Sequence, residues 1–102
     1  MYKAIAVCGC GMGTSLVLRM SAEKAIKEMG VAHLLEVEHM DLGSAKSMPC
    51  DFYIITEDMR DTFEREHRRF VSVKTAFDAN ALKSGLSEMV KELDEEKEGT
   101  RR

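Results

Sequence analysis

The sequence predicts an α/β fold in which one open sheet of four parallel strands has helices on both faces. Short apolar runs, typical of buried parallel strands, alternate with segments whose apolar residues recur every three or four positions, as in amphipathic helices. Strands that alternate with helices form right-handed βαβ units, and we expect the strand order 2-1-3-4. The expected architecture is therefore a three-layer sandwich.

The first half of the chain supplies two of the strands and the first helix. Residues 4–7 form a short apolar run that glycines end, and residues 34–40 form the second strand. Between them, apolar residues recur at helical spacing from Ser15 to Met29, with charged residues on the other side. Gly30 then provides the left-handed C-terminal stop of this helix.

The second half supplies two more strands and two more helices. Residues 52–55 are the expected central strand and residues 70–73 the fourth. Residues 58–67 are mostly polar and predict a short, poorly buried helix. Asp78 can cap a last helix, whose core face consists of Leu82, Leu86, Met89, Val90 and Leu93. This order of elements is typical of Rossmann-like or flavodoxin-like folds.

Length and composition predict one domain. With 102 residues the chain is long enough to bury a single core and too short for two. We expect the domain to span residues 1–94 and the charged residues 95–102 to form a disordered tail, because they contain nothing to bury. The net charge of −3 gives no general reason to bind nucleic acid.

No segment of the sequence predicts export or membrane insertion. The N-terminal apolar run at residues 4–8 is far shorter than a signal-peptide core or a membrane span. We therefore expect a cytoplasmic protein. Three cysteines, an odd number, in a chain without an export signal predict reduced thiols rather than a disulfide framework.

The most informative stretch joins the first strand to the first helix and reads Cys8-Gly9-Cys10-Gly11-Met12-Gly13-Thr14-Ser15. In a 2-1-3-4 sheet the ligand crevice lies beyond the end of the first strand, where the winding reverses. A helix N-terminus there offers backbone N–H groups and the positive end of its dipole to an anion. The glycines allow positive φ and close approach to a ligand, and the hydroxyls of Thr14 and Ser15 can cap the helix or donate to an oxyanion.

Cys8 is the candidate nucleophile of this loop. An environment that stabilises anions also stabilises a thiolate, and so lowers the pKa of a cysteine. A cysteine at a strand end is more often a small buried hydrophobe, and a glycine loop can serve a tight turn alone. Three alternating glycines followed by Thr14 and Ser15 at a helix start favour the anion-binding interpretation.

The same residues carry a resemblance to a known family. The run from Cys8 to Ser15, directly after a short first strand, resembles the IIB subunits of the bacterial phosphoenolpyruvate-dependent sugar phosphotransferase system. The similarity extends through the order of elements to about Leu93. The form Cys-Gly-x-Gly-x-Gly-Ser/Thr-Ser is most similar to the ascorbate-type and galactitol-type branch, and Cys10 departs from the polar or small residue usual at its position.

The resemblance implies a cytoplasmic phosphoryl carrier. Cys8 would be the phosphocysteine, which accepts a phosphoryl group from the phosphohistidine of a IIA subunit. It would pass that group to a sugar, of ascorbate-like or galactitol-like type, on the membrane-embedded IIC permease. No metal or organic cofactor is implied. The phosphate-binding residues would be Gly9, Cys10, Gly11, Met12, Gly13, Thr14 and Ser15.

The alternative is an enzyme resembling the low-molecular-weight tyrosine phosphatases or arsenate reductases, which also use a cysteine loop after the first strand. Their loop has Arg after five intervening residues, where its planar fork binds the phosphoryl oxygens, and this sequence has Thr14 there. Such a loop can hold a phosphoryl group but is poorly equipped to hydrolyse it. Asp58 and Asp78 are the candidate general acids, although each is more often a helix cap.

The third class is a redox or metal module. The Cys8-Gly9-Cys10 stretch lacks the two-residue spacing of thioredoxin-like sites, and no second cysteine pair is present to hold zinc. His33 and His39 are six residues apart on a candidate strand, roughly 20 Å at about 3.3 Å per residue, too far to share one ion. We expect Cys50 to be a small buried residue and His67 to lie on a solvated face.

Overall fold

The computed structural model describes residues 2–7, 12–75 and 77–100, which form an α/β fold. Within these residues four parallel strands pair in the order β2-β1-β3-β4. The strands are β1 (Tyr2–Val7), β2 (Leu35–His39), β3 (Phe52–Thr56) and β4 (Phe70–Val73). The predicted fold class and strand order are confirmed.

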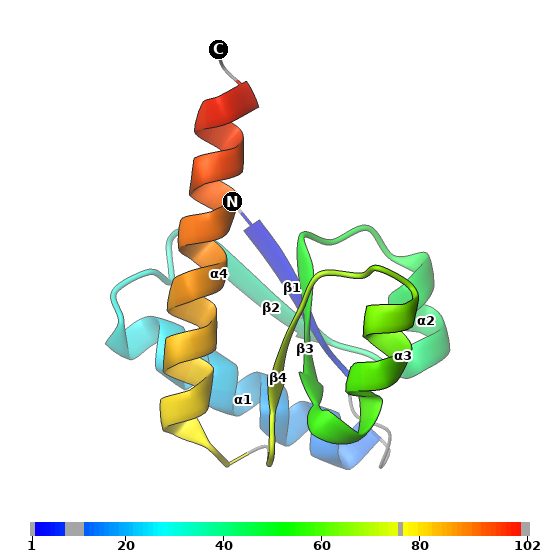
Figure 1. Cartoon of the computed structure of the whole chain (residues 1–102). Coiled ribbons are helices and arrows are strands. Elements are labelled where there is room, and N and C mark those ends of the chain that lie inside the picture. The colour runs from blue at the N-terminus through cyan, green and yellow to red at the C-terminus, as the bar shows by residue number, and fades with distance from the viewer. Residues whose placement is uncertain (1, 8–11, 76, 101–102) are drawn as a thin grey trace.

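Helices connect the strands and cover both faces of the sheet. They are α1 (Met12–Glu28), α2 (Leu42–Ser47), the 3-10 turn η1 (Glu57–Met59), α3 (Arg60–Arg65) and α4 (Ala79–Thr100). The helices α1 and α4 lie on one face, and α2 and α3 lie on the other (Figure 1). The sheet is therefore the middle one of three layers.

The interior strand β1 is buried on both of its faces. Ala4 and Ala6 belong to the core cluster under α1 and α4, whereas Ile5 and Val7 belong to the cluster under α2 and α3. Successive side chains of a strand point to opposite faces, so a strand covered on both faces needs a continuous apolar run. β3 is also interior, and all of its residues are buried.

The C-terminal stop of α1 has the predicted chemistry. Gly30 has φ +75°, in the left-handed region that favours glycine. Its N–H donates to Lys27 O at 3.2 Å, and the N–H of Val31 donates to Ile26 O at 3.0 Å. These two bonds form a Schellman motif, which satisfies carbonyl groups of the last helical turn.

The predicted helix at residues 58–67 is present as η1 followed by α3, and its apolar side is better buried than expected. Met59 and Phe63 are both buried in the cluster under α2 and α3. The ring of Phe63 meets Tyr53 of β3 edge-on, with centroids 5.0 Å apart, and Phe70 of β4 at 6.2 Å. Two large apolar side chains are therefore enough to hold this short segment on the sheet.

The sequence pattern does not predict α2, which is short and contains the weak helix former Gly43. Asp41 starts this helix as its N-cap, and its carboxylate accepts a hydrogen bond from the Ser44 N–H at 3.1 Å. Hydrogen bonds from Ser44 hold the pKa of Asp41 below its ordinary value. Tyr53 then fixes α2 to the sheet, because its hydroxyl donates to Ala45 O at 3.2 Å.

The C-terminal segment differs in part from the expected disordered tail at residues 95–102, because residues 95–100 are helical, while residues 101–102 lie outside the described residues. In the structure α4 continues to Thr100, well beyond the buried Leu93, and residues 94–96, which follow Leu93, are exposed. Residues 95–98 are Glu and Lys, which are good helix formers and need no core to remain helical. Glu96 also forms an ion pair with Arg69, which precedes β4. Helix propensity and this contact explain the extension.

A close approach of α4 to β4 gives a stability test at Gly85. A Cβ at Gly85 would lie 2.4 Å from Val71 Cγ1. We expect Gly85→Ala to lower the free energy of unfolding by about 1–3 kcal/mol through overpacking, although Ala is the better helix former. Urea unfolding measures this change. Gly43→Ala is the control, because a Cβ there makes an ordinary 3.4 Å contact. Equal stability of Gly85→Ala and the parent protein would contradict this account of the packing.

Candidate functional site

The carboxyl edge of the sheet contains the predicted switch point. After β1 the chain crosses through α1 to β2, and after β2 it crosses back through α2 to β3 on the other side of β1. The two connecting helices lie on opposite faces of the sheet (Figure 1). Ligands of open parallel sheets bind at such a point. The segment that joins Val7 to Met12 therefore starts at the position expected of a binding loop.

Part of the predicted site lies outside the described residues, namely Cys8, Gly9, Cys10 and Gly11. Met12, Gly13 and Thr14 are described as the first residues of α1. Ser15 follows them and is only 1% exposed. The structure thus places the start of α1 at the carboxyl edge of the sheet (Figure 1).

The helix α1 begins at Met12, earlier than the predicted start at Ser15. Thr14 and Ser15 are therefore helical residues and not N-caps. The expectation that their hydroxyls cap the helix is wrong, and the expectation that they donate to an oxyanion stays a prediction. Gly13 is helical too, so positive φ is not the reason for glycine at this position. The backbone N–H groups in the first turn of a helix have no acceptor within the helix. The first turn of α1 also contains no acidic residue that could neutralise the positive end of the helix dipole.

Two polar residues at this edge were not predicted as site residues. Thr56 ends β3, next to β1 in the sheet, and is 7% exposed. His39 ends β2 on the other side of β1, and its Nδ1 is buried. In β2 the first uncharged polar residue after the last apolar residue is His39, and in β3 it is Thr56. This pattern is the signal by which the sequence could have indicated them. The structure brings both to the edge from which the candidate loop starts.

Cys50 lies at the opposite, amino edge of the sheet. It precedes β3, is half-buried, and packs against the cluster under α2 and α3, in partial agreement with the prediction of a buried residue. Burial is the main reason that the pKa of its thiol is raised, and a hydrogen bond with Tyr53 opposes this effect. A raised pKa leaves the thiol protonated, so Cys50 is a poor nucleophile at neutral pH.

The two candidate general acids of a phosphatase are placed differently. The carboxylate of Asp78 accepts a hydrogen bond from the Ala81 N–H at 3.1 Å and therefore caps the start of α4. Asp58 is exposed on η1, after the end of β3. Asp78 thus has the structural role that is more common for its position.

The described residues contain no group of three or more His, Cys, Asp or Glu side chains that could hold a metal ion. His33 lies in the exposed turn before β2, and His39 ends that strand. His67 is exposed, as predicted. In the same described portion of the chain, every helix is too short or too polar to cross a membrane.

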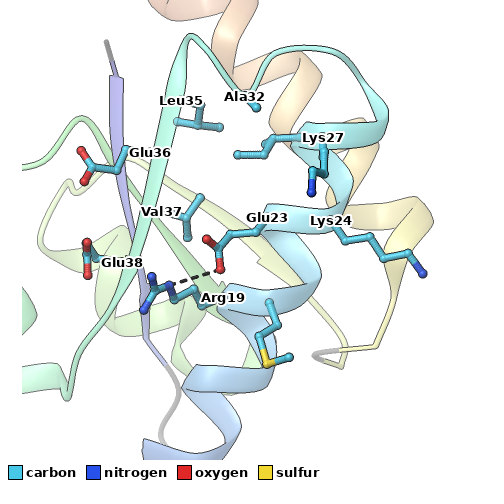
Figure 2. Close-up of a pocket in the computed structure, with 11 residues that line it drawn as sticks. Arg19, Glu23, Lys24, Lys27, Ala32, Leu35, Glu36, Val37 and Glu38 are labelled. Atoms are coloured by element: carbon cyan, nitrogen blue, oxygen red, sulfur yellow. Dashed lines mark ion pairs between the residues drawn. The ribbon is translucent and has the colours of Figure 1, made fainter.

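A groove of about 870 Å³ runs between α1 and the edge strand β2 (Figure 2). Leu35 and Val37 contribute apolar surface, and the charged residues around it have both signs. Arg19 pairs with Glu23 of the same helix at 3.3 Å, as Figure 2 shows. These charges do not converge on one ligand. We therefore consider the carboxyl edge, and not this groove, the candidate site.

Comparison with known proteins identifies the family. A family model described as "PTS system, Lactose/Cellobiose specific IIB subunit" matches residues 3–96. The chain belongs to this IIB family. A curated relative, the "Ascorbate-specific PTS system EIIB component" of Mycoplasma pneumoniae (strain ATCC 29342 / M129 / Subtype 1), is 34% identical over 89 residues, which cover 84% of this chain and 92% of the relative.

The predicted membership of the IIB family is confirmed. IIB subunits are phosphotransferases of sugar phosphotransferase systems and act together with IIA and IIC partners. Neither comparison favours the tyrosine phosphatase or arsenate reductase alternative.

The half-buried position of Cys50 predicts slow alkylation. Only the thiolate reacts, and the raised pKa of Cys50 means that its rate with iodoacetamide should increase at higher pH in the folded protein than in the unfolded one. The measurement is a pH profile of the alkylation rate of a Cys8→Ser/Cys10→Ser variant, with the same variant in urea as the reference. A folded midpoint at or below the urea midpoint would refute the burial argument.

Proposed function

We propose that this IIB subunit is a cytoplasmic phosphoryl carrier in which Cys8 is the phosphorylated residue. Cys8 accepts the phosphoryl group from the phosphohistidine of a IIA subunit and passes it to a carbohydrate during uptake through the IIC permease. The observation that supports this proposal best is the place of Cys8 in the chain, directly after the last residue of the interior strand β1. We assign the carrier domain to residues 1–94.

Each half-reaction transfers one phosphoryl group and needs no cofactor. In the first, the Cys8 thiolate attacks phosphorus, an S–P bond forms, and the N–P bond of the IIA phosphohistidine breaks, so that the imidazole keeps the electron pair and takes up one proton from solvent. In the second, a sugar hydroxyl attacks phosphorus, loses its proton to solvent, and forms an O–P bond while the S–P bond breaks. The Cys8 thiolate is regenerated, so the subunit is ready for another cycle.

We propose that residues 9–15 surround the phosphoryl group. The first-turn N–H groups of α1 and the helix dipole favour an anion at this position, and the dipole contributes on the order of 0.3–2 kcal/mol. The glycines let the backbone come close to the phosphoryl oxygens, a role that does not require positive φ at Gly13. The hydroxyls of Thr14 and Ser15 are further donors.

The carbohydrate is proposed to be ascorbate-like or galactitol-like. The form of the Cys8–Ser15 run supports this class, as does the name of the Mycoplasma pneumoniae relative. The IIC permease is the partner that binds the sugar, so the choice among related sugars depends on IIC and not on this subunit.

Substitution of single cysteines tests which thiol carries the phosphoryl group. We expect Cys8→Ser to abolish phosphoryl transfer and Cys10→Ser to retain most of it, because Cys8 directly follows β1. Intact mass after incubation with phosphoenolpyruvate, the general phosphotransferase proteins and a candidate IIA measures phosphorylation. Cys50→Ser serves as the control from the opposite edge of the sheet. An active Cys8→Ser with an inactive Cys10→Ser would show that the loop is read in the wrong register.

A second test separates a carrier from a phosphatase. Thr14 stands where a phosphatase has Arg, and loss of one well-placed transition-state donor typically costs about a hundredfold or more in rate. We expect the purified protein to hydrolyse p-nitrophenyl phosphate barely at all, and its Cys8 phosphate to outlive a phosphatase intermediate by orders of magnitude. Multiple turnovers that Cys8→Ser abolishes would reject the carrier assignment. Asp58 would then be the first residue to test as the acid.

A further inference from the structure

The outer edge of β2 is open to another strand. β2 comes first in the order β2-β1-β3-β4, and among the residues that the structure describes it pairs with β1 alone. The N–H of Met40 donates to Ala6 O at 3.2 Å, and alternate residues of a strand bond to the same neighbour, so the even-numbered residues of β2 face β1. The odd-numbered residues direct their backbone N–H and C=O groups to the open side, and these are Leu35, Val37 and His39.

The groove between α1 and β2 runs along this open edge (Figure 2). Its charges do not converge on one small ligand, but an extended chain does not need convergent groups. When a chain adds to a sheet edge, backbone hydrogen bonds supply affinity, and space for alternate side chains supplies specificity. Met20 of α1 lines the groove and is 60% exposed. It offers apolar surface to every second side chain of an added strand.

β2 has different chemistry on its two faces. Figure 2 shows Leu35 and Val37 on the side of α1, and Glu36 and Glu38 on the other side. Glu36 is exposed and Glu38 is half-buried. The register partner of Glu36 in β1 is Lys3, yet the ion pairs among the described residues include neither glutamate. Two negative charges at the spacing of alternate strand residues therefore face a neighbouring strand.

The two glutamates disfavour a second copy of this chain as the added strand. Two copies of β2 around a twofold axis perpendicular to the sheet would pair antiparallel. If the axis passes at Val37, Glu36 of each copy lies opposite Glu38 of the other, and if it passes at either glutamate, that residue lies opposite its own copy. Like charges directly opposite one another destabilise a sheet, whereas opposite charges stabilise it. The strand that fits this edge is therefore basic.

We propose that the outer edge of β2 binds an extended segment of a partner protein, which adds to the sheet as a further strand. Basic residues of this segment lie opposite Glu36 and Glu38, and they alternate with apolar residues that pack over the groove beside Met20. The inference goes beyond the proposed function. It rests on β2 and α1 alone and does not depend on the role of Cys8.

Peptide binding followed by NMR tests this proposal. The probe is the capped peptide Val-Lys-Val-Lys-Val, whose lysines match the spacing of Glu36 and Glu38, and its control is Val-Glu-Val-Glu-Val. In ¹⁵N-labelled protein at low ionic strength, the basic peptide should shift the amide resonances of Leu35, Val37 and His39 most, because these N–H groups gain acceptors. The amides of Glu36 and Glu38 face β1 and should shift less. The acidic peptide should bind roughly tenfold more weakly.

A charge swap isolates the contribution of the two glutamates. Glu36→Lys/Glu38→Lys should weaken binding of the basic peptide roughly tenfold and strengthen binding of the acidic peptide by a similar factor, because each cross-strand charge pair changes sign. The matched control is Glu88→Lys/Glu95→Lys, which makes the same change in net charge at exposed positions of α4. This control variant should keep the preference of the parent protein for the basic peptide.

Three results would overturn the proposal. The first is no shift of the β2 amides at millimolar basic peptide. The second is a shift that spares Leu35, Val37 and His39, since attraction between surface charges alone would then explain the binding. The third is equal affinity of the parent protein for both peptides. None of these results affects the carrier function, because the experiment uses unphosphorylated protein and no other subunit.

Discussion

β1 is hydrogen-bonded to a neighbour on each side and buried on each face, and the other elements are arranged around it. Its small residues, Ala4 and Ala6, face α1, whereas Ile5 and Val7 face α2 and α3. Burial of an Ile or Val side chain contributes about 1.5–3 kcal/mol each. Because β2 and β3 pair with β1 from opposite sides, the chain must reverse its winding at the end of this strand. The constraint that builds the core thus also locates the candidate site.

The two edges of the sheet differ in their chemistry. The amino edge is held by side-chain bonds between distant segments: Asp51 accepts the Lys3 N–H at 2.7 Å, and the Tyr2 hydroxyl donates to Asp94 of α4. The carboxyl edge instead presents the first turn of α1 and the ends of the strands beside β1. These side-chain bonds at the amino edge join β1 to the segment before β3 and to α4, and they stabilise the fold at the edge opposite the candidate site.

The spacing of apolar residues predicts the strands and helices whose side chains face the core. It does not predict an element that forms because of a helix cap or a contact with a distant residue. The strands, the last helix and the stop at Gly30 follow from apolar spacing and glycine chemistry, so they agree with the structure. α2 depends on a cap at Asp41 and on the Tyr53 hydroxyl, neither of which leaves an apolar period. The candidate site shows the same division: the loop is recognisable as a sequence motif, but the position of His39 at the same edge of the sheet follows only from the pairing of β2 with β1, which the sequence pattern does not reveal.

Gly85 has a consequence for the axial position of α4. The missing Cβ forms a notch into which Val71 of β4 fits, and a shift of the helix by one turn would bring Ala81 or Met89 to that place. Both residues have a side chain that would occupy the space of Val71, so Gly85 favours one axial position of α4 relative to the sheet. The helix α1 packs beside α4 on the same face. The absence of a side chain at Gly85 thus helps to set the position of α4, and α1, whose first turn lies at the edge of the candidate site, packs against α4.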